Sequence, residues 1–377
     1  MAKAKPARIT DVIGVLNQLC PPDLAEDWDN VGLQVGDPTV EVSKILLCLD
    51  AEETAIEEAK RCDAQLIIAH HPLIFRAIKR LSPLDMPGRI LFQAIKENIA
   101  VASAHTNLDR AADGLNDWLA ARLGLVESKP LEKPKTGQLY KLVVYVPRGH
   151  ESAVMEAVFA AGAGQIGAYD RCSFRVSGTG SFRGNEDTVP FIGTAGEMEE
   201  TEEVRLETIV PAANLTSVVN RMLKSHPYEE VAYDLIPLAN QLSAVGLGRV
   251  GRLAQTSTLR NFADQVRSAL NITSLRIVGH PDQKISKVAV CGGSGMSIYA
   301  DAVRHGADCL VTGDIKFHEA QKARTEGMAL IDAGHFATER IMVEELSRRM
   351  RAIFAERQFA IEVLELGTEE DPFVTLG

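Results

Sequence analysis

Short apolar runs alternate with segments of helical periodicity over much of this 377-residue chain. One series comprises KILLCLD from Lys44, LIIAHHP from Leu66 and IAVASAH from Ile99. Continuous short apolar runs are typical of strands that are buried on both faces of a parallel sheet. The segments between them are long enough to hold crossover helices, so the pattern predicts β-α-β units.

This pattern occurs twice. KILLCLDAEETAIEEAKRCDAQLIIAHHPLIF resembles KVAVCGGSGMSIYADAVRHGADCLVTGDIKFH with a constant offset of 243 residues, so that Lys44 pairs with Lys287 and His70 with Gly313. A further apolar run, MALIDAGH from Met328, completes the second copy. We therefore predict an α/β fold with a duplicated three-layer core, whose two pseudo-symmetric halves span residues 1–126 and 244–377. Because ligands collect at the carboxyl ends of parallel strands, we expect a site between the halves.

A different pattern separates the two halves. ESKPLEKPKTGQ, residues 127–138, is polar with two prolines and is interpreted as a linker. Residues 139–238 then alternate in the order β-α-β-β-α-β, which predicts an inserted ferredoxin-like α+β domain. Inside it, the acidic stretch GEMEETEE (residues 196–203) is interpreted as a solvated loop.

Composition narrows the class of protein. The formal net charge of −11 gives no broad basic surface for nucleic acid, so we expect no nucleic-acid partner. The six cysteines form no CxxC pair, which favours a reducing compartment over a disulfide scaffold. No signal peptide or apolar membrane-spanning run is evident, so we expect a cytoplasmic protein with no membrane partner.

The candidate chemistry lies where predicted strands end. Adjacent imidazoles at a strand end cannot both enter an apolar core, because side chains alternate in direction, but they can flank a metal pair. Imidazole and carboxylate are common ligands for zinc, iron and manganese. Two residues four apart share one face of a helix. The predicted ligands are His70, His71, Asp109, His335 and Glu339. His105 is predicted to orient a ligand or to carry a proton in catalysis.

Other motifs left alternatives open. Asp314 and His318 fit a contact to substrate or to a ligand better than direct ligation. The GGSG stretch after Cys291 could hold a phosphate on backbone N–H groups or form a tight turn. GLGRVG, from Gly246, lacks the strand-then-helix context of a dinucleotide site, so no nucleotide cofactor is predicted there. WDNVGLQVGD, from Trp28, could line the site or pack an edge. HPYEE, from His226, is interpreted as a helix end.

WDNVGLQVGD, AHHPLIF, SAHTNLD, TGDIKFHEA and GHFATE, in this order, closely resemble the motifs of the GTP cyclohydrolase I type 2 homologs, also called NIF-three-like dinuclear metal proteins. The resemblance implies two divalent metal ions, zinc, iron or manganese, held by the five predicted ligands. It also implies a ring-shaped homohexamer. Residues 139–238 are similar to the PII-like and divalent-cation-tolerance-like domain that longer members carry.

Metal centre and resemblance together favour a di-metal hydrolase of GTP cyclohydrolase type, which opens the guanine ring of a purine nucleotide with a metal-bound hydroxide. A di-metal phosphoester hydrolase needs the same metal pair, so the sequence does not separate the two. A third hypothesis is a non-catalytic, metal-dependent regulatory or scaffold protein whose insert senses a small molecule.

Overall fold

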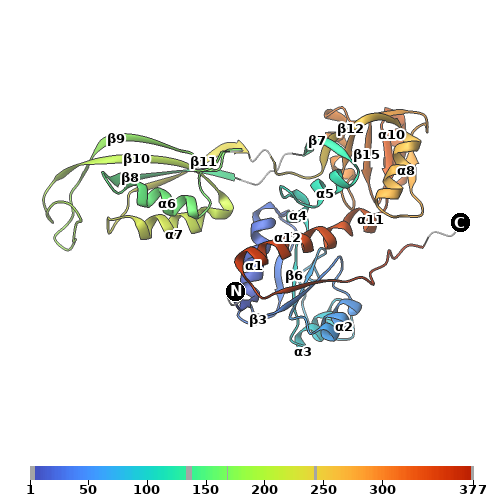
Figure 1. Ribbon diagram of the computed structural model, residues 1–377, viewed down its shortest axis with the longest axis horizontal. Helices are drawn as coiled ribbons and strands as arrows, with labels where there is room; N and C mark the ends of the chain where they lie inside the picture. Colours follow the sequence, from blue (N-terminus) through green and yellow to red (C-terminus); the bar gives the residue numbers. More distant parts are fainter. Residues whose placement is uncertain (1–4, 133–137, 168, 242–243, 375–377) are drawn as a thin grey trace. The chain divides into compact units, whose positions relative to one another are not determined.

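The computed structural model describes residues 5–132, 138–167, 169–241 and 244–374. The chain divides into two compact units, one formed by residues 1–134 with 244–377 and the other by residues 135–243. The first unit contains a mainly parallel five-stranded sheet, a mixed six-stranded sheet and a two-stranded antiparallel sheet, and the second unit contains one antiparallel sheet (Figure 1). The predicted α/β class is thereby confirmed.

The first sheet of the larger unit has five strands in the order β17-β4-β5-β6-β2. All neighbouring pairs are parallel except β2 with β6. Helices α2 and α3 pack on one face, against Leu46 and Ile67, while α1 and α12 cover the other (Figure 1). The bounds are α1 (Ile9–Leu19), β2 (Gly32–Val35), β4 (Lys44–Cys48), α2 (Glu53–Cys62), β5 (Leu66–Ala69), α3 (Gly88–Lys96), β6 (Ala100–Ser103), α12 (Ile341–Arg357) and β17 (Glu362–Glu365).

The second sheet has six strands in the order β13-β16-β15-β14-β12-β7, with β14, β15 and β16 parallel. Helices α9 and α10 pack against it through Ala302 and Ala323, while α5 and α8 contact β12 and β14. The bounds are α5 (Leu115–Arg122), β7 (Leu125–Pro130), β12 (Arg249–Thr258), α8 (Leu259–Ala269), β13 (Arg276–Val278), β14 (Lys284–Val290), α9 (Tyr299–Arg304), β15 (Cys309–Thr312), α10 (Phe317–Glu326) and β16 (Ala329–Asp332).

Shorter elements complete this unit. They are the two-stranded sheet of β1 (Ala7–Arg8) with β3 (Glu41–Val42), the helices α4 (Thr106–Arg110) and α11 (His335–Glu339), and the 3₁₀ turns at Pro22–Leu24 and Met296–Ile298. None of the helices in the described residues is long and apolar enough to cross a membrane.

The sequence repeat is also a structural repeat. Lys44 Nζ donates to the Cys62 carbonyl at 2.9 Å, and Lys287 Nζ donates to the His305 carbonyl at the matching place in the second copy. In both copies a strand lysine, Lys44 of β4 or Lys287 of β14, therefore ties that strand to the end of the following helix. This shared contact explains why the lysine recurs at both positions of the repeat.

The predicted linker was partly wrong. Residues 127–130 belong to strand β7, which pairs antiparallel with β12, so that Lys129 lies opposite Val250. Residues 126–129 are all exposed along this edge strand, where charged residues are tolerated, and this hid the strand from a composition-based prediction. Residues 133–137 of the predicted linker lie outside the described residues. In addition, β17 near the C-terminus joins the sheet of the first half.

The smaller unit has the order β-α-β-β-α-β, and its four strands pair antiparallel in the order β11-β8-β10-β9. Both helices cover one face of the sheet (Figure 1), where Val144, Val154 and Val218 meet in its core. The bounds are β8 (Gln138–Pro147), α6 (Glu151–Ala160), β9 (Ser173–Phe182), β10 (Glu199–Pro211), the 3₁₀ turn Ala212–Asn214, α7 (Leu215–Ser225) and β11 (Tyr233–Gln241).

The acidic stretch of this unit is not wholly a loop. Residues 199–203 form the first part of β10, and Glu203 lies opposite both Pro147 and Gly178. Glu200 and Glu202 are exposed on this strand, and Glu202 pairs with Arg148 at 2.7 Å. Backbone pairing across the hairpin outweighs the low strand propensity of glutamate.

Candidate metal centre

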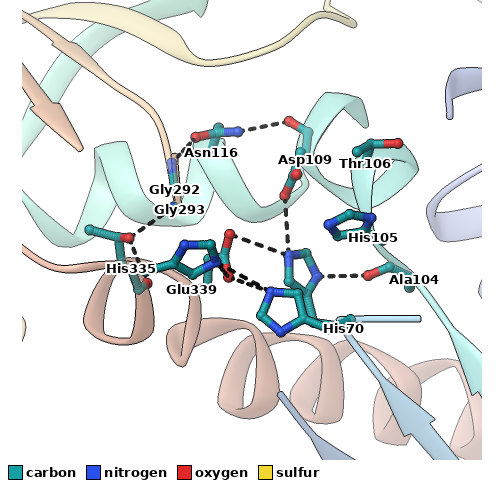
Figure 2. A network of polar contacts seen from close by, with 12 residues as sticks. His70, Ala104, His105, Thr106, Asp109, Asn116, Gly292, Gly293, His335 and Glu339 are labelled. Atoms are coloured by element: carbon teal, nitrogen blue, oxygen red, sulfur yellow. Dashed lines mark hydrogen bonds and ion pairs between the residues drawn. The ribbon is translucent and has the colours of Figure 1, made fainter. Parts of the chain in front are cut away.

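The residues predicted as ligands come from three strand ends of the larger unit. His70 and His71 follow β5, Asp109 lies on α4 after β6, and His335 and Glu339 lie on α11 after β16. β5 and β6 belong to the five-stranded sheet and β16 to the six-stranded sheet, and the carboxyl ends of these strands bring their side chains to the same space. Figure 2 shows His70, His335 and Glu339 around this space, which all five side chains approach.

Each histidine of the cluster is oriented through its Nδ1 atom. His70 Nδ1 donates to the Ala104 carbonyl at 2.7 Å, and this carbonyl can only accept. His71 Nδ1 lies 2.8 Å from Asp50 Oδ1, and His335 Nδ1 lies 2.7 Å from Asp314 Oδ2. Such partners fix the tautomer and ring orientation of metal-binding histidines. The Nε2 atoms are therefore the nitrogens that face the shared space.

The Glu339 carboxylate spans two groups of imidazoles. Its Oε2 lies 3.0 Å from His71 Nε2 and 2.9 Å from His335 Nε2, whereas its Oε1 lies 3.7 Å from His70 Nε2. His71, His335 and Glu339 together have the geometry of a group that could hold a metal ion. The two oxygens of Glu339 therefore face different imidazoles, since Oε2 faces His71 and His335 and Oε1 faces His70.

The donor atoms fit a metal better than they fit one another. His70 Nε2 and Asp109 Oδ1 are buried, and within the described part of the chain neither has a hydrogen-bond partner. They lie 3.6 Å apart, in ion-pair range but beyond hydrogen-bond distance. Burying polar atoms without partners costs free energy, which a shared cation between them would offset. The mixed imidazole and carboxylate donors suit zinc, iron(II) or manganese.

A glycine turn makes room for the carboxylate. Gly293 follows β14 with a φ of +58°, and a Cβ there would overlap Glu339 Oε1 and lie 3.2 Å from His335 Nε2. The backbone N–H groups of this turn are already used, because Gly292 donates to Asn116 Oδ1 and Gly293 donates to Thr338 Oγ1, both at 2.9 Å (Figure 2). Of the two alternatives for the GGSG stretch, these contacts favour the tight turn over the phosphate-binding loop.

His105 lies at the edge of the cluster. Its Nδ1 atom is 2.9 Å from Asp29 Oδ1, and its ring centroid is 5.3 Å from that of His70. Burial opposes ionisation of Asp29, but hydrogen bonds from His105 and Thr106 lower the pKa of this carboxyl to about 2. Asp29 is therefore an anion that fixes the tautomer of His105. His70, His71 and His105 are also close enough to hold one cation, so His105 is placed either to carry protons or to bind a metal.

Carboxylates raise the pKa values of the two half-exposed histidines. Burial alone would lower the pKa of His71, but its hydrogen bonds to Asp50 and Glu339 raise it to about 10. For His335 the hydrogen bond to Glu339 is the largest effect, and together with Asp314 it raises the pKa to about 9 despite burial. Without a cation, both imidazoles are therefore positively charged at neutral pH, because each carries a second proton in the place that a metal ion would take.

The two buried carboxyls are shifted in opposite directions. Burial favours the protonated form of both, but His70, His335 and His71 lower the pKa of Glu339 far below its ordinary value. Asp109 has fewer compensating contacts, so desolvation dominates and raises its pKa. A cation next to Asp109 would reverse this shift, because a nearby positive charge favours the ionised carboxyl.

The other residues singled out in the sequence lie outside the cluster of predicted ligands. Asp314 supports His335 rather than facing the centre itself, as expected for a contact to a ligand. His226 directly follows the last residue of α7. Its Nε2 atom bonds to the Tyr145 carbonyl, and its Nδ1 atom accepts from the Tyr228 N–H. The interpretation of His226 as a helix end is thus confirmed. Gly246 and Gly248 precede strand β12, in agreement with the rejected dinucleotide site.

Two carboxylates of this centre had no assigned role in the sequence. Asp29 in WDNVGLQVGD could have lined the site or packed an edge, and Asp50 lies at the end of the first strand of the repeat. The position of Asp50 after β4 was the available signal, since that strand end lies beside the end of β5. No comparable signal existed for Asp29, whose contact with His105 spans 76 residues.

Fold and site together define an α/β protein with a buried histidine–carboxylate cluster suited to a metal ion. The chain matches the Duf34/NIF3 (NGG1p interacting factor 3) family over residues 7–372 and belongs to that family. Its predicted membership is therefore confirmed.

Related proteins agree with this assignment. The chain is 42% identical to a protein of Halalkalibacterium halodurans over 96% of this chain and 97% of the relative, and 42% identical to a protein of Bacillus subtilis over 99% and 100%. Both relatives are named "GTP cyclohydrolase 1 type 2 homolog". The solved structure of a Bacillus cereus protein related to NIF3 matches with a TM-score of 0.89 and 37% identity, over 99% of this chain and 100% of that one.

Metal binding is expected to release protons. Because the pKa values of His71 and His335 in the metal-free protein are about 10 and about 9, a metal ion must displace protons at pH 7. The apparent affinity for Mn²⁺ should rise as the pH increases towards 9. Calorimetric titration in two buffers of different ionisation enthalpy measures the protons released, and equal heats with a pH-independent affinity would contradict the assignment.

Gly293→Ala is expected to remove metal binding, since its Cβ would displace Glu339. Gly306→Ala is the matched control, because Gly306 has a similar φ of +66° and no atom within 4 Å of its added Cβ. Both variants carry a backbone penalty of about 1 kcal/mol, but only the first should lose metal, by at least about tenfold in affinity. Equal metal content in both would contradict the role of this turn.

Proposed function

We propose that this protein is a di-metal hydrolase that acts on a purine nucleotide, with the ring-opening chemistry of a GTP cyclohydrolase. The observation that carries the proposal is the Glu339 carboxylate, which turns one oxygen to His71 and His335 and the other to His70. Two divalent cations held there would lower the pKa of a bound water and so supply a nucleophile near neutral pH.

The residues of the centre differ in burial and in their proposed roles. His70 and Asp109 form the buried side of the centre, whereas the side chains of His71 and His335 are 26% and 36% exposed. Substrate therefore approaches from the side of His71 and His335. His105, held by the anionic Asp29, is placed to accept a proton from the attacking water and to return it to the leaving nitrogen.

In the proposed reaction, water adds to C8 of guanine and the bond from C8 to the ring nitrogen breaks. This gives a formamide, and a second water then releases formate. Each step needs one proton removed from water and one delivered to nitrogen, which a single imidazole of fixed tautomer can do.

His105→Gln should abolish turnover while metal content stays unchanged, if His105 is the proton carrier. Loss of metal in this variant would instead make His105 a ligand.

An exposed aromatic pair supports a planar substrate. Trp28 and Phe75 are 57% and 48% exposed, with ring centroids 5.7 Å apart. The indole centroid lies 6.1 Å from the ring of His105. Both contacts of Trp28 are tilted or edge-on, so neither covers an indole face by parallel stacking. A purine base stacked on Trp28 would lie beside His105.

The aromatic pair is held from both sides. Asn30 Nδ2 donates to the Ile74 carbonyl at 2.6 Å, and the Ile74 N–H donates to Gln34 Oε1 at 3.0 Å. These contacts tie the segment of Trp28 to that of Phe75. The exposed stretch after Phe75 carries Arg76, Lys79 and Arg80, whose cations suit the phosphates of a nucleotide.

The test of the proposed reaction is release of formate from GTP. Wild-type protein loaded with zinc, iron(II) or manganese should release formate, and His335→Ala should not, because it loses a predicted metal ligand. His280→Ala is the matched control, since His280 is an exposed histidine that pairs with the nearby Asp282. Absence of formate with all three metals would contradict the proposed reaction. Phosphate release measured in the same samples distinguishes a phosphoester hydrolase.

Trp28→Ala should raise the KM for GTP by about tenfold and leave kcat nearly unchanged, because base stacking on an aromatic side chain contributes about 1–3 kcal/mol. Phe92→Ala is the control, since Phe92 is similarly exposed but lies on α3, in the helix layer behind the first sheet. Steady-state kinetics of the two variants measure the effect. An unchanged KM in the Trp28 variant would rule out stacking there.

A further inference from the structure

The smaller unit contains a cavity of about 310 Å³ between its β9–β10 hairpin and the segment that follows α7. Its walls include Phe182, Phe191, Tyr228, Glu203, Glu229 and Arg183. A volume of this size is at the small end of the range for binding sites of small molecules. All of these residues belong to residues 135–243, so the cavity is complete within this unit.

Three aromatic rings form a continuous wall. The ring centroids of Phe182 and Tyr228 are 6.0 Å apart, and those of Phe191 and Tyr228 are 6.2 Å apart. Both pairs are tilted, at 59° and 55°, so the rings meet at angles instead of stacking face to face. All three residues line the cavity, so a cation bound there would lie beside aromatic rings, whose π-faces attract positive charge.

The charge of the cavity has the matching sign. Three glutamates, including Glu230, line it together with the single cation Arg183, and this gives an excess of negative charge. The Tyr228 hydroxyl donates to Glu203 Oε1 at 3.0 Å and so fixes the carboxylate beside the aromatic wall. Glu229 is also held, since its Oε1 accepts from the Val189 N–H at 3.2 Å.

The Glu203 carboxylate occupies the space above Gly180, a residue that has no side chain. Glu203 lies over Gly180 of the paired strand, and a Cβ at Gly180 would overlap Oε2 and the carboxyl carbon of Glu203. The carboxylate therefore lies close to the β9 backbone, beside the cavity. Aromatic rings, a carboxylate held in place and a small cavity occur here together, and the proposed metal chemistry uses none of them.

We propose that this cavity binds a compact organic cation, with a quaternary or alkylated ammonium group placed against Phe182, Phe191 and Tyr228 and paired with Glu203. Both aromatic rings and a carboxylate attract such a cation. A neutral molecule of the same shape gains only the apolar contact. The inference is independent of the proposed hydrolase reaction, since it concerns residues of the smaller unit alone.

The test uses choline as the probe and 3,3-dimethyl-1-butanol as its neutral isostere. Calorimetric titration of the full-length protein should detect choline at millimolar concentration or tighter, with the neutral isostere at least about tenfold weaker. Equal affinity for the two compounds, or no binding of choline and of tetramethylammonium, would overturn the proposal.

Variants locate the binding. Glu203→Gln keeps the shape of the side chain and removes its charge, and Phe191→Leu removes a ring that is 52% exposed and so contributes little to the core. Each should weaken choline binding by at least about fivefold. Glu202→Gln is the matched control, because Glu202 is the preceding residue of β10, pairs with Arg148 and does not line this cavity.

The control also distinguishes a local effect from a general one. Choline binding that is lost equally in Glu202→Gln and Glu203→Gln would show a response to net charge and would overturn the proposed site. Formate release from GTP in Glu203→Gln should equal that of the wild type, because Glu203 lies outside the metal cluster. The two proposals can therefore fail separately.

Discussion

A buried carboxylate among imidazoles is the interaction on which the larger unit depends. Glu339 is 4% exposed, and its charge would be costly there without His71, His335 and His70 around it. This requirement draws the ends of β5 and β16, from two different sheets, to one place. The centre therefore also connects the two halves of the core, and bound cations would stabilise the contact between them.

The duplicated core produces one metal centre, because the two copies differ at the residue that follows their second strand. His70 follows β5, while the equivalent Gly313 follows β15. A Cβ at Gly313 would lie 2.6 Å from the His335 backbone nitrogen, so the absence of a side chain lets α11 begin close to that strand end. The first copy thus supplies a ligand, and the second supplies the space that α11 needs to deliver His335 and Glu339.

Local patterns were enough for much of this account. Periodicity predicted the α/β core and the order of the elements in residues 139–238, and strand-end positions predicted the five residues that the structure brings together. Long-range contacts were not accessible: Asp29 meets His105 only in the folded chain, and Thr338 occupies an N–H group that had been considered for phosphate. The strand β7 was missed because its pairing with β12 depends on a segment more than a hundred residues away.

Metal content of Glu339→Gln, compared with wild type, tests the central claim most directly. Gln keeps the shape of Glu339 but offers one oxygen and no charge to the imidazoles on either side. Mass-spectrometric metal analysis of protein reconstituted with zinc should give two ions per chain in the wild type and fewer than one in the variant. Two ions retained in Glu339→Gln, or none in correctly folded wild type with zinc, iron(II) or manganese, would contradict the account.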